Sequence, residues 1–408
     1  MKGMSVLMAG VAAAALMVTA CAAMAAGAAT DATPASATPT TEELAARVDA
    51  LEAELQDAEI RATADHDKVE GWKPLKGWWD DTKISGRMYY NFSYVDSDRN
   101  HVDGTGNGTS FEIKRFYVGI DHTFDKTFSA NVTTDFTYDS TVGATQLYIK
   151  KAYLQAKLDD AFTVRLGSAD LPWIPFAEGV YGYRYVENTI ADRTKFGTSA
   201  DWGIHMLGKF YDGLLDYQFS VVNGSGYKKT TRSKGMDFEG RVGLHYEGFT
   251  LGVGGYVGKL GAQKGTETHH TAGRFDAIAA YKYEGLNVGV EYFYAENYTQ
   301  VTSQTASHAT GVSPFVSYTF TPQWKVFGRY DYVKPYSDTA RKDFKNNYYN
   351  IGVTYSPAKI VDFSLVYKHD GGSDGYFKTS NGTIGGDAFA TGNDGNYNEF
   401  GLFGRLRW

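Results

Sequence analysis

The sequence predicts an all-β protein, a transmembrane antiparallel β-barrel of about 16 strands that follows a short N-terminal coiled-coil helix. Aromatic residues make up 15% of the 408 residues although the mean hydropathy is only −0.36. From Tyr89 to Trp408 the rings are spread singly among polar residues, in runs that alternate apolar and polar positions. Connections between these runs alternate between short and long. This combination is typical of strands with one face toward lipid and the other toward water.

Alternation is clearest in residues 127–138, where one face is apolar and the other carries only Ser, Asn, Thr and Asp. A fully polar face suits a water-filled lumen and is unsuited to the core of a soluble sandwich. The same reading predicts sixteen strands, at 83–96, 111–123, 127–138, 147–158, 161–168, 201–210, 214–223, 236–247, 249–258, 273–283, 286–296, 312–320, 324–333, 346–355, 361–368 and 397–408.

The prolines agree with these boundaries. Proline breaks a strand ladder, and of the nine prolines only Pro314 falls in a predicted strand, near its start. The last strand ends the chain on Trp408, which resembles the aromatic C-terminal signal of barrels that are assembled in the outer membrane.

The bulk composition excludes several classes of protein. A net charge of −7 argues against nucleic-acid binding. The single cysteine, Cys21, excludes a disulfide framework and a cysteine metal site. We expect no cofactor, no metal and no catalytic residue. The pair His269-His270 lacks the carboxylate support that a metal site would need.

Residues 1–25 are predicted to be a signal peptide, with Lys2 at its positive start and a small-residue cleavage site at Ala23-Met24-Ala25. A retained anchor and a lipoprotein acylated at Cys21 are the alternatives. No later segment is a hydrophobic run long enough for a transmembrane helix, so a membrane-embedded mature chain has to close into a barrel.

Before the barrel we predict three segments. Residues 26–40, rich in Ala, Thr and Pro, form a flexible linker. Residues 41–62 begin with a capping-box pattern and carry apolar residues at spacings of four and three, which predicts a periplasmic coiled coil. An amphipathic helix lying on another surface is the alternative. A connector at 63–82 leads into the barrel domain at 83–408.

The long connection at 169–200 follows the fifth predicted strand and contains the partly apolar run from Leu171 to Phe176. A long, partly apolar loop has to bury itself, and the barrel interior is available. We therefore expect it to narrow the channel, and the alternative is packing over the rim or against a neighbouring subunit. The constriction residues expected from it are Pro172, Trp173, Arg184, Arg193 and Lys195.

Basic residues outnumber acidic ones on the predicted inward faces, although the whole chain is acidic. Cations in a pore wall favour anions. The alternative is that these cations pair with carboxylates across the wall and stiffen it. The predicted pore-lining set is Arg87, Arg115, Lys151, Arg165, Lys209, Arg241, Arg274, Arg329 and Arg405.

Two stretches point to a known family. The run Phe111-Glu112-Ile113-Lys114-Arg115-Phe116-Tyr117-Val118-Gly119 and the segment from Leu154 to Pro175, with Val164-Arg165-Leu166-Gly167, resemble the phosphate-selective porin O/P family. So does the order of leader, coiled coil and barrel. The resemblance implies a sixteen-stranded homotrimeric porin that passes anions, in some members phosphate.

The expected function is therefore passive diffusion of small hydrophilic or anionic solutes through the bacterial outer membrane. The expected partners are outer-membrane lipid, lipopolysaccharide and further copies of the chain, with no nucleic acid. Two alternatives are a structural barrel whose coiled coil tethers the envelope and a barrel hydrolase. The run from Gly371 to Gly375 matches a nucleophile-elbow pattern, but that motif needs a strand-turn-helix context.

The coiled coil predicts the effect of a deletion. Removing residues 41–60 should weaken the oligomer, because the helices that hold the subunits together are lost, and should leave conductance intact. Native gels and bilayer recordings measure these two properties. An unchanged oligomer on the gel would show that the segment has another role.

Overall fold

The computed structural model describes residues 77–139, 144–265, 267–298, 301–336, 343–386 and 392–408. The predicted signal peptide, linker and coiled coil, and the connector up to residue 76, lie outside the described residues. Within them the first regular element is strand β1, which begins at Thr82.

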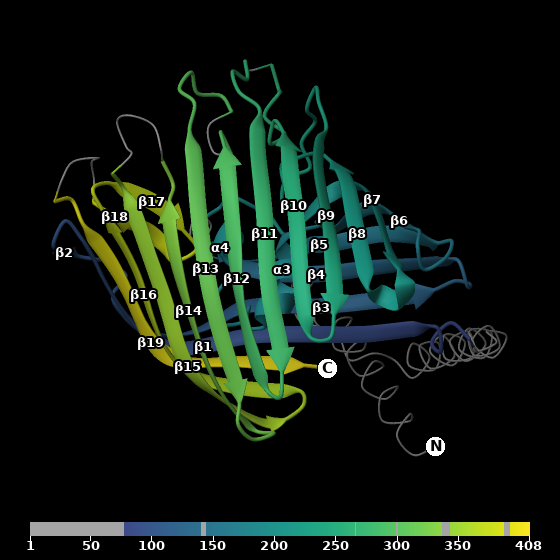
Figure 1. Cartoon of the computed structure of the whole chain (residues 1–408), viewed down its shortest axis with the longest axis horizontal. Helices are drawn as coiled ribbons and strands as arrows, with labels where there is room; N and C mark the ends of the chain where they lie inside the picture. The colour runs from purple at the N-terminus through teal and green to yellow at the C-terminus, as the bar shows by residue number, and fades with distance from the viewer. Residues whose placement is uncertain (1–76, 140–143, 266, 299–300, 337–342, 387–391) are drawn as a thin grey trace, which may run out of the picture. The chain divides into compact units, whose positions relative to one another are not determined.

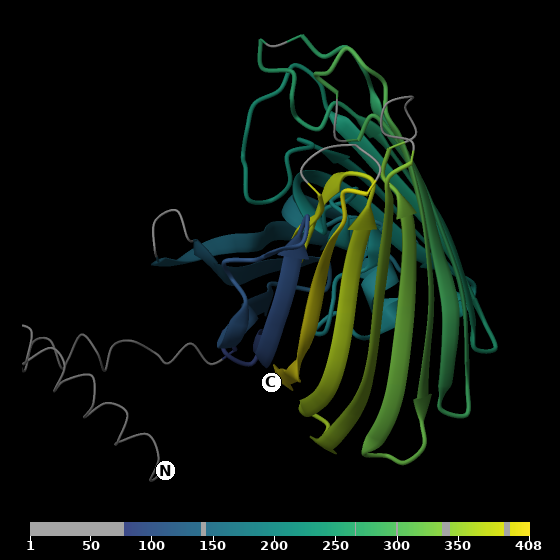
Figure 2. The ribbon, with the colours of Figure 1, turned by 90° about the vertical axis from the view of Figure 1, so that its left-hand side faces the viewer.

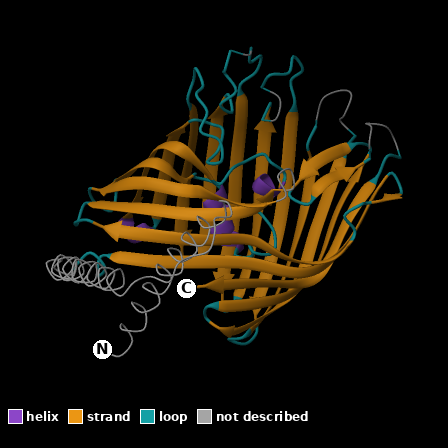
Figure 3. Ribbon diagram, turned by 180° about the vertical axis from the view of Figure 1, so that it is seen from behind, coloured by secondary structure: helices purple, strands orange, loops and turns teal. Residues whose placement is uncertain are grey.

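Sixteen antiparallel strands form the barrel (Figures 1 and 3). Each pairs with the next along the chain, as the alternation of hairpins predicted. Their bounds are β1 (Thr82–Arg99), β3 (Gly108–Thr123), β4 (Phe128–Asp139), β5 (Ala144–Lys157), β6 (Thr163–Asp170), β7 (Ala200–Phe210), β8 (Leu215–Val222), β9 (Asp237–Tyr246), β10 (Phe249–Gly258), β11 (Ala272–Tyr283), β12 (Leu286–Glu296), β13 (His308–Thr319), β14 (Trp324–Lys334), β15 (Lys345–Ala358), β16 (Val361–Ser373) and β19 (Gly395–Arg407).

The first and last strands close the barrel, as Figure 2 shows for the side where they meet. β1 pairs with β3 on one edge and with β19 on the other. The backbones of Gly86 and Trp408 exchange hydrogen bonds of 3.0 and 3.1 Å, so the last residue is part of the ladder. Closure leaves no open sheet edge, which is the condition for crossing lipid. The predicted barrel of sixteen strands is confirmed.

Smaller elements lie in the connections. The loop between β6 and β7 contains helices α3 (Ile174–Tyr181) and α4 (Ile190–Arg193), and η1 (Tyr211–Gly213) joins β7 to β8. No helix within the described ranges is long and apolar enough to cross a membrane. Sequence reading missed the two-residue strand β2 (Val102–Asp103) and the hairpin β17 (Tyr376–Thr379) and β18 (Gly382–Gly385), because short strands inside Gly-rich loops carry no sustained alternation.

Pro314 corrects the sequence analysis. It was expected near the start of a strand, but it lies in the interior of β13, paired with Val290 of β12. On its other side the ladder to β14 omits Ser313 and Pro314 and resumes at Phe315. The missing N–H of proline accounts for this local interruption. The strand begins at His308, four residues before the predicted start, which is why the proline looked terminal.

The outer face of each strand carries apolar side chains that are exposed toward lipid, and the inner face lines the barrel interior. In β10, Leu251, Val253 and Val257 point outward and are about half exposed, whereas inward-facing Tyr256 is 6% exposed. Large apolar side chains are similarly exposed around the barrel, for example Ile84, Leu147, Ile351 and Leu365. Such a band is stable only against hydrocarbon, so the barrel spans a membrane.

A two-residue turn joins β9 to β10 and sets their register. Glu247 and Gly248 have φ values of 43° and 86°, the left-handed pair of a type I′ hairpin. A Cβ at Gly248 would also overlap the carbonyl oxygen of Lys282. The glycine is therefore required both by the backbone conformation and by the neighbouring strand.

This turn generates a stability prediction. Gly248→Ala should lower the free energy of unfolding by about 1–2 kcal/mol, the usual cost of a left-handed non-glycine residue, and the clash adds to it. Gly273→Ala is the matched control, because its Cβ would meet nothing within 4 Å. Urea titration followed by the gel-mobility shift of folded barrels measures both. Equal midpoints for the two variants would refute the argument.

Candidate functional site

The loop from Leu171 to Ser199, hereafter the inner loop, runs inside the barrel between β6 and β7. Most of its side chains are buried, with Leu171, Trp173 and Ile174 no more than 1% exposed. Most of its contacts, described below, are with inward-facing residues of β9 to β16, and others are with Lys114 of β3, with Arg405 of β19 and with Ser380. The loop therefore fills the part of the lumen that lies along those strands.

Two carboxylates hold the start of the inner loop. The backbone N–H of Trp173 donates to Glu239 of β9 at 3.0 Å, and its indole N–H donates to Glu291 of β12 at 2.9 Å. The guanidinium of Arg241 donates to the carbonyl of Pro172 at 3.0 Å and lies over the ring of Phe176. These contacts place α3 against the inner face of β9 and β10.

Glycines of β10 make the space that these rings occupy. A Cβ at Gly252 would overlap the ring of Phe176, and one at Gly254 would lie 2.8 Å from the indole of Trp173. Close approach of a backbone to a packed group is a common reason for glycine within a strand.

The far end of the inner loop is fixed by Arg193. Its guanidinium donates to Asp331 and Asp370 at 2.9 Å and to Asn346 at 3.0 Å, on β14, β16 and β15. The group is 0% exposed. The backbone carbonyl of Arg193 accepts a hydrogen bond from the N–H of Ser380, at the tip of the β17–β18 hairpin. Removing Arg193 would leave two buried carboxylates short of a partner, which is costly.

The middle of the loop is rich in tyrosine. Tyr183 stacks on Phe327 of β14 with ring centroids 4.0 Å apart, and the hydroxyl of Tyr185 lies 2.7 Å from that of Ser364 on β16. Tyr181 accepts a hydrogen bond from Asn350 at 3.2 Å. The loop is thus attached to the wall at its start, middle and end.

Glu187 joins the inner loop to the seam of the barrel. Its carboxylate lies 3.6 Å from Lys368, which also pairs with Glu399 at 2.8 Å. Lys114 of β3 donates to the carbonyl of Val186 at 2.9 Å. Burial disfavours the charged form of Glu187, but Lys114 and Lys368 outweigh burial and hold its pKa below the usual range. The carboxylate therefore stays ionised at neutral pH.

Open space remains between α3 and the opposite wall. It is a cavity of about 700 Å³ bounded by the inner loop on one side and by β1, β3 to β6 and β19 on the other. Six basic side chains line it against three acidic ones. The basic residues are Arg87, Lys150, Lys151, Arg184, Arg405 and Arg407, and the acidic ones are Asp121, Asp170 and Glu178.

Two β-bulges bring additional lysines to the inner face of the barrel, and one of them, Lys150, lines this cavity. The register shifts beside Tyr89 and beside Thr133, which leaves Lys114 and Lys150 as extra residues in β3 and β5. Because a bulge points two successive residues to one face, Lys114 lies inside with Arg115, and Lys150 lies inside with Lys151.

Sequence reading assumed unbroken alternation and missed both lysines. A detectable signal was present, because the outward apolar residues change phase at each bulge. Ile113 is followed by Phe116 three positions later, and Ile149 is followed by Ala152 three positions later. A spacing of three within an alternating run is what one inserted residue produces.

Tyrosines contact several cations of this wall. Arg87 donates to the hydroxyl of Tyr89 at 3.2 Å, and the ammonium of Lys150 lies 4.7 Å from the ring centre of Tyr117. Within the described residues neither cation forms an ion pair with a carboxylate. A neutral partner positions a cation without cancelling its charge. Lys151, by contrast, pairs with Asp170 at 3.0 Å.

The predicted site residues therefore divide into groups. Arg87, Lys151, Arg184 and Arg405 line the large cavity. Two more lie on the same wall, Arg115 at 3.7 Å from Asp135 and Arg165 at 2.8 Å from Gln155. Lys209 and Arg241 line a separate cavity of about 290 Å³, together with Asp216. Arg274 is buried beneath the inner loop in ion pairs with Glu239 and Asp276, and Arg329 is buried there in an ion pair with Asp331. Lys195 is exposed.

Two sequence features considered for other chemistry, the pair His269-His270 and the run from Gly371 to Gly375, lie in the described part of the chain. There, no group of three or more His, Cys, Asp or Glu side chains could hold a metal ion. The segment from Gly371 to Ser373 ends strand β16 and leads to another strand, β17. The strand-turn-helix context of a nucleophile elbow is therefore not formed at this position.

Comparisons with known proteins agree with the barrel fold. The model of the Gram-negative porin family matches residues 12–375, so the chain belongs to that family. It is accordingly an outer-membrane diffusion channel. None of the curated proteins compared matches the chain.

Several solved structures share the fold. The anion-selective porin from Comamonas acidovorans is 11% identical, with a TM-score of 0.60 over 80% of this chain and 99% of that one. The trimer form of OmpT, an outer membrane protein of Vibrio cholerae, is 13% identical, with a TM-score of 0.54 and the same coverages. The outer membrane channel DcaP of Acinetobacter baumannii is 11% identical, with a TM-score of 0.55 over 80% and 97%.

The glycine that admits the inner loop yields a prediction. Gly252→Val should displace α3, because the new side chain occupies the place of the Phe176 ring, and should change single-channel conductance while the barrel still forms. Gly240→Val is the control, because its Cβ would make only ordinary contacts, the nearest at 3.5 Å with Phe219. Planar-bilayer recordings of folded protein compare the two. Identical conductance would mean that α3 does not limit the current.

Proposed function

We propose that this porin prefers anions, and that the 700 Å³ cavity between α3 and the wall of β1, β3 to β6 and β19 is its constriction. The supporting observation is the excess of cations there. Six basic side chains face three acidic ones, a side-chain balance of +3. In a narrow passage with low-dielectric walls, such an excess raises the local concentration of anions.

The distribution of ion pairs supports the same proposal. Where the inner loop meets the wall, Arg193 of the loop and Arg274, Arg329 and Lys368 of the strands all pair with buried carboxylates. Those cations hold the loop, and their charge is cancelled locally. On the open wall, Arg87 and Lys150 are contacted by tyrosine. The uncancelled charge is therefore concentrated along the open passage.

A narrower form of the proposal names phosphate as the preferred anion, as the resemblance to the phosphate-selective porin O/P family implies. Several cations around one passage can form charge-assisted hydrogen bonds with more than one oxygen of a phosphate. A conductance series in chloride and phosphate tests it. Saturation at low phosphate concentration supports the narrower form, and a simple scaling with ion mobility rejects it.

We further propose that the channel assembles as a homotrimer in lipid and lipopolysaccharide. Support comes from the fold shared with OmpT, whose solved structure is described as a trimer. A structural barrel that only tethers the envelope, or a barrel hydrolase, would be silent in the same bilayer recordings.

The decisive test reverses charge at the constriction. The double variant Arg87→Glu with Lys150→Glu changes the lining balance from +3 to −1, because each substitution removes one positive and adds one negative charge. The reversal potential in a salt gradient should move from anion toward cation preference. Both residues lack carboxylate partners within the described residues, so no buried acid is orphaned.

A matched control carries the same change in net charge. Lys126→Glu with Lys264→Glu alters two exposed lysines outside the strands, one in a short turn and one in a long loop. Its reversal potential should equal that of the parent chain. If both double variants behave alike, the cavity does not select the ions.

A further inference from the structure

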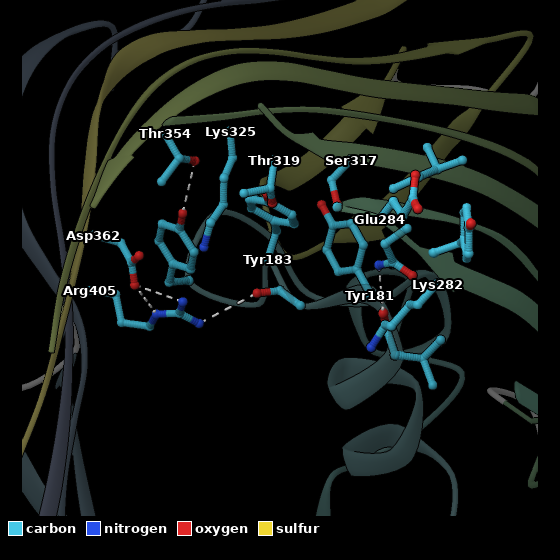
Figure 4. A pocket seen from close by; sticks show the side chains of 17 residues that line it. Tyr181, Tyr183, Lys282, Glu284, Ser317, Thr319, Lys325, Thr354, Asp362 and Arg405 are labelled. Atoms are coloured by element: carbon cyan, nitrogen blue, oxygen red, sulfur yellow. Dashed lines mark hydrogen bonds and ion pairs between the residues drawn. The ribbon is translucent and has the colours of Figure 1, made fainter. Parts of the chain in front are cut away.

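A third cavity lies on the periplasmic side of the inner loop. It measures about 440 Å³ and is bounded by residues 180–185 of the loop and by the ends of strands β11 to β16 and β19 (Figure 4). The turn Glu284-Gly285 belongs to its lining. Because short barrel turns face the periplasm, this space, hereafter the periplasmic chamber, opens on that side.

Inner-loop residues bound one side of the chamber and pack against aromatic residues of β13 and β14. Tyr181 contacts Phe315 with ring centroids 5.6 Å apart, and Tyr183 stacks on Phe327. The chamber meets the large cavity at Arg405 and Gly182, which line both. A 3.5 Å hydrogen bond from Arg405 to the carbonyl of Gly182 marks this boundary. The chamber is thus a side pocket, separate from the proposed constriction.

Three cations line the chamber: Lys282, Lys325 and Arg405. Figure 4 shows the ammonium end of Lys325 directed toward the guanidinium of Arg405. Neither lysine forms an ion pair or a side-chain hydrogen bond in the described part of the chain. Of the two acids in the lining, Asp362 is engaged by Arg405 and Arg407 at 2.7 and 3.2 Å, and Glu284 lies exposed in the turn.

Hydroxyl groups share the same wall. Lys325 is the cross-strand neighbour of Thr319 on β13 and of Thr354 on β15. Ser317 lies two residues before Thr319, on the same face, and also lines the chamber. Unpaired ammonium groups beside hydroxyl donors are the set that binds the oxygens of phosphate or carboxylate. The volume lies within the range of about 300–1,000 Å³ that is usual for small-molecule sites.

We propose that the periplasmic chamber is an anion-binding site, distinct from the constriction, for a small oxyanion that enters from the periplasm. Lys282, Lys325 and Arg405 supply the charge, and Ser317 supplies a hydroxyl group. The site shares Arg405 and Gly182 with the large cavity, has an otherwise separate lining, and holds whether or not the constriction selects anions.

A cysteine reporter tests the proposal. Thr319→Cys places a thiol in the chamber of the full chain, and the parent chain without this substitution gives the background reaction. Inorganic phosphate should slow the reaction of this thiol with an uncharged methanethiosulfonate reagent, relative to sodium chloride at equal ionic strength. A parallel series in acetate distinguishes phosphate from carboxylate as the preferred oxyanion.

Replacing Lys282 and Lys325 tests whether these two lysines bind the phosphate that protects the thiol. In the Thr319→Cys chain that also carries Lys282→Gln and Lys325→Gln, the phosphate concentration for half protection should rise about tenfold, since two charge-assisted contacts are lost. A thiol at exposed Gln323, in the turn after β13, should be unprotected in both backgrounds. No protection at Thr319→Cys, or equal protection with and without the lysines, would overturn the proposal.

Reversal potentials separate this site from the constriction. The Lys282→Gln and Lys325→Gln chain retains Arg87, Lys150 and the rest of the large cavity's lining, so its ion preference should match that of the parent. A loss of protection with an unchanged reversal potential supports an independent site. A reversal potential that falls together with protection would show that chamber and constriction are one site.

Discussion

The structure depends on one constraint: lipid offers no hydrogen-bond partner to a backbone. Every edge of the sheet has to be paired inside the membrane, and the ladder between β1 and β19, extended by the bonds between Gly86 and Trp408, makes the final pairing. Once the sheet is closed, one face of each strand meets hydrocarbon and the other meets the lumen. The exposed apolar band and the polar interior both follow from that closure.

Closure of the barrel creates a lumen, and the inner loop fills part of it. Buried polar contacts and ion pairs determine which strands the loop packs against. Arg193, Trp173 and Glu187 attach the inner loop to strands β9 to β16. Each contact joins a group that would be costly to bury alone to a partner that would otherwise be unpaired. The mutual dependence of loop and wall leaves packed protein on one side of the lumen and an open cavity on the other.

Paired and unpaired cations lie on different parts of the inner wall. Where the loop covers the wall, arginine and lysine are balanced by carboxylates and have a structural role. Where the wall is open, Arg87 and Lys150 are contacted by tyrosine and keep an uncancelled charge. The count of inward basic residues therefore does not by itself give the charge that lines the open space, because ion pairing and burial cancel part of it.

Sequence alone determined the barrel, its sixteen strands and the alternation of turns and loops, because side-chain period and turn composition are local properties that lipid and water select directly. It could not determine which inward cations stay open, since the partners Asp331 and Asp370 of Arg193, and the partner Glu187 of Lys368, lie far away in the chain. It also missed Lys114 and Lys150, because a bulge becomes visible only when two strands are paired. Tertiary structure decided the path of the inner loop, and with it the passage and the periplasmic chamber, since both exist only where that loop meets the closed wall.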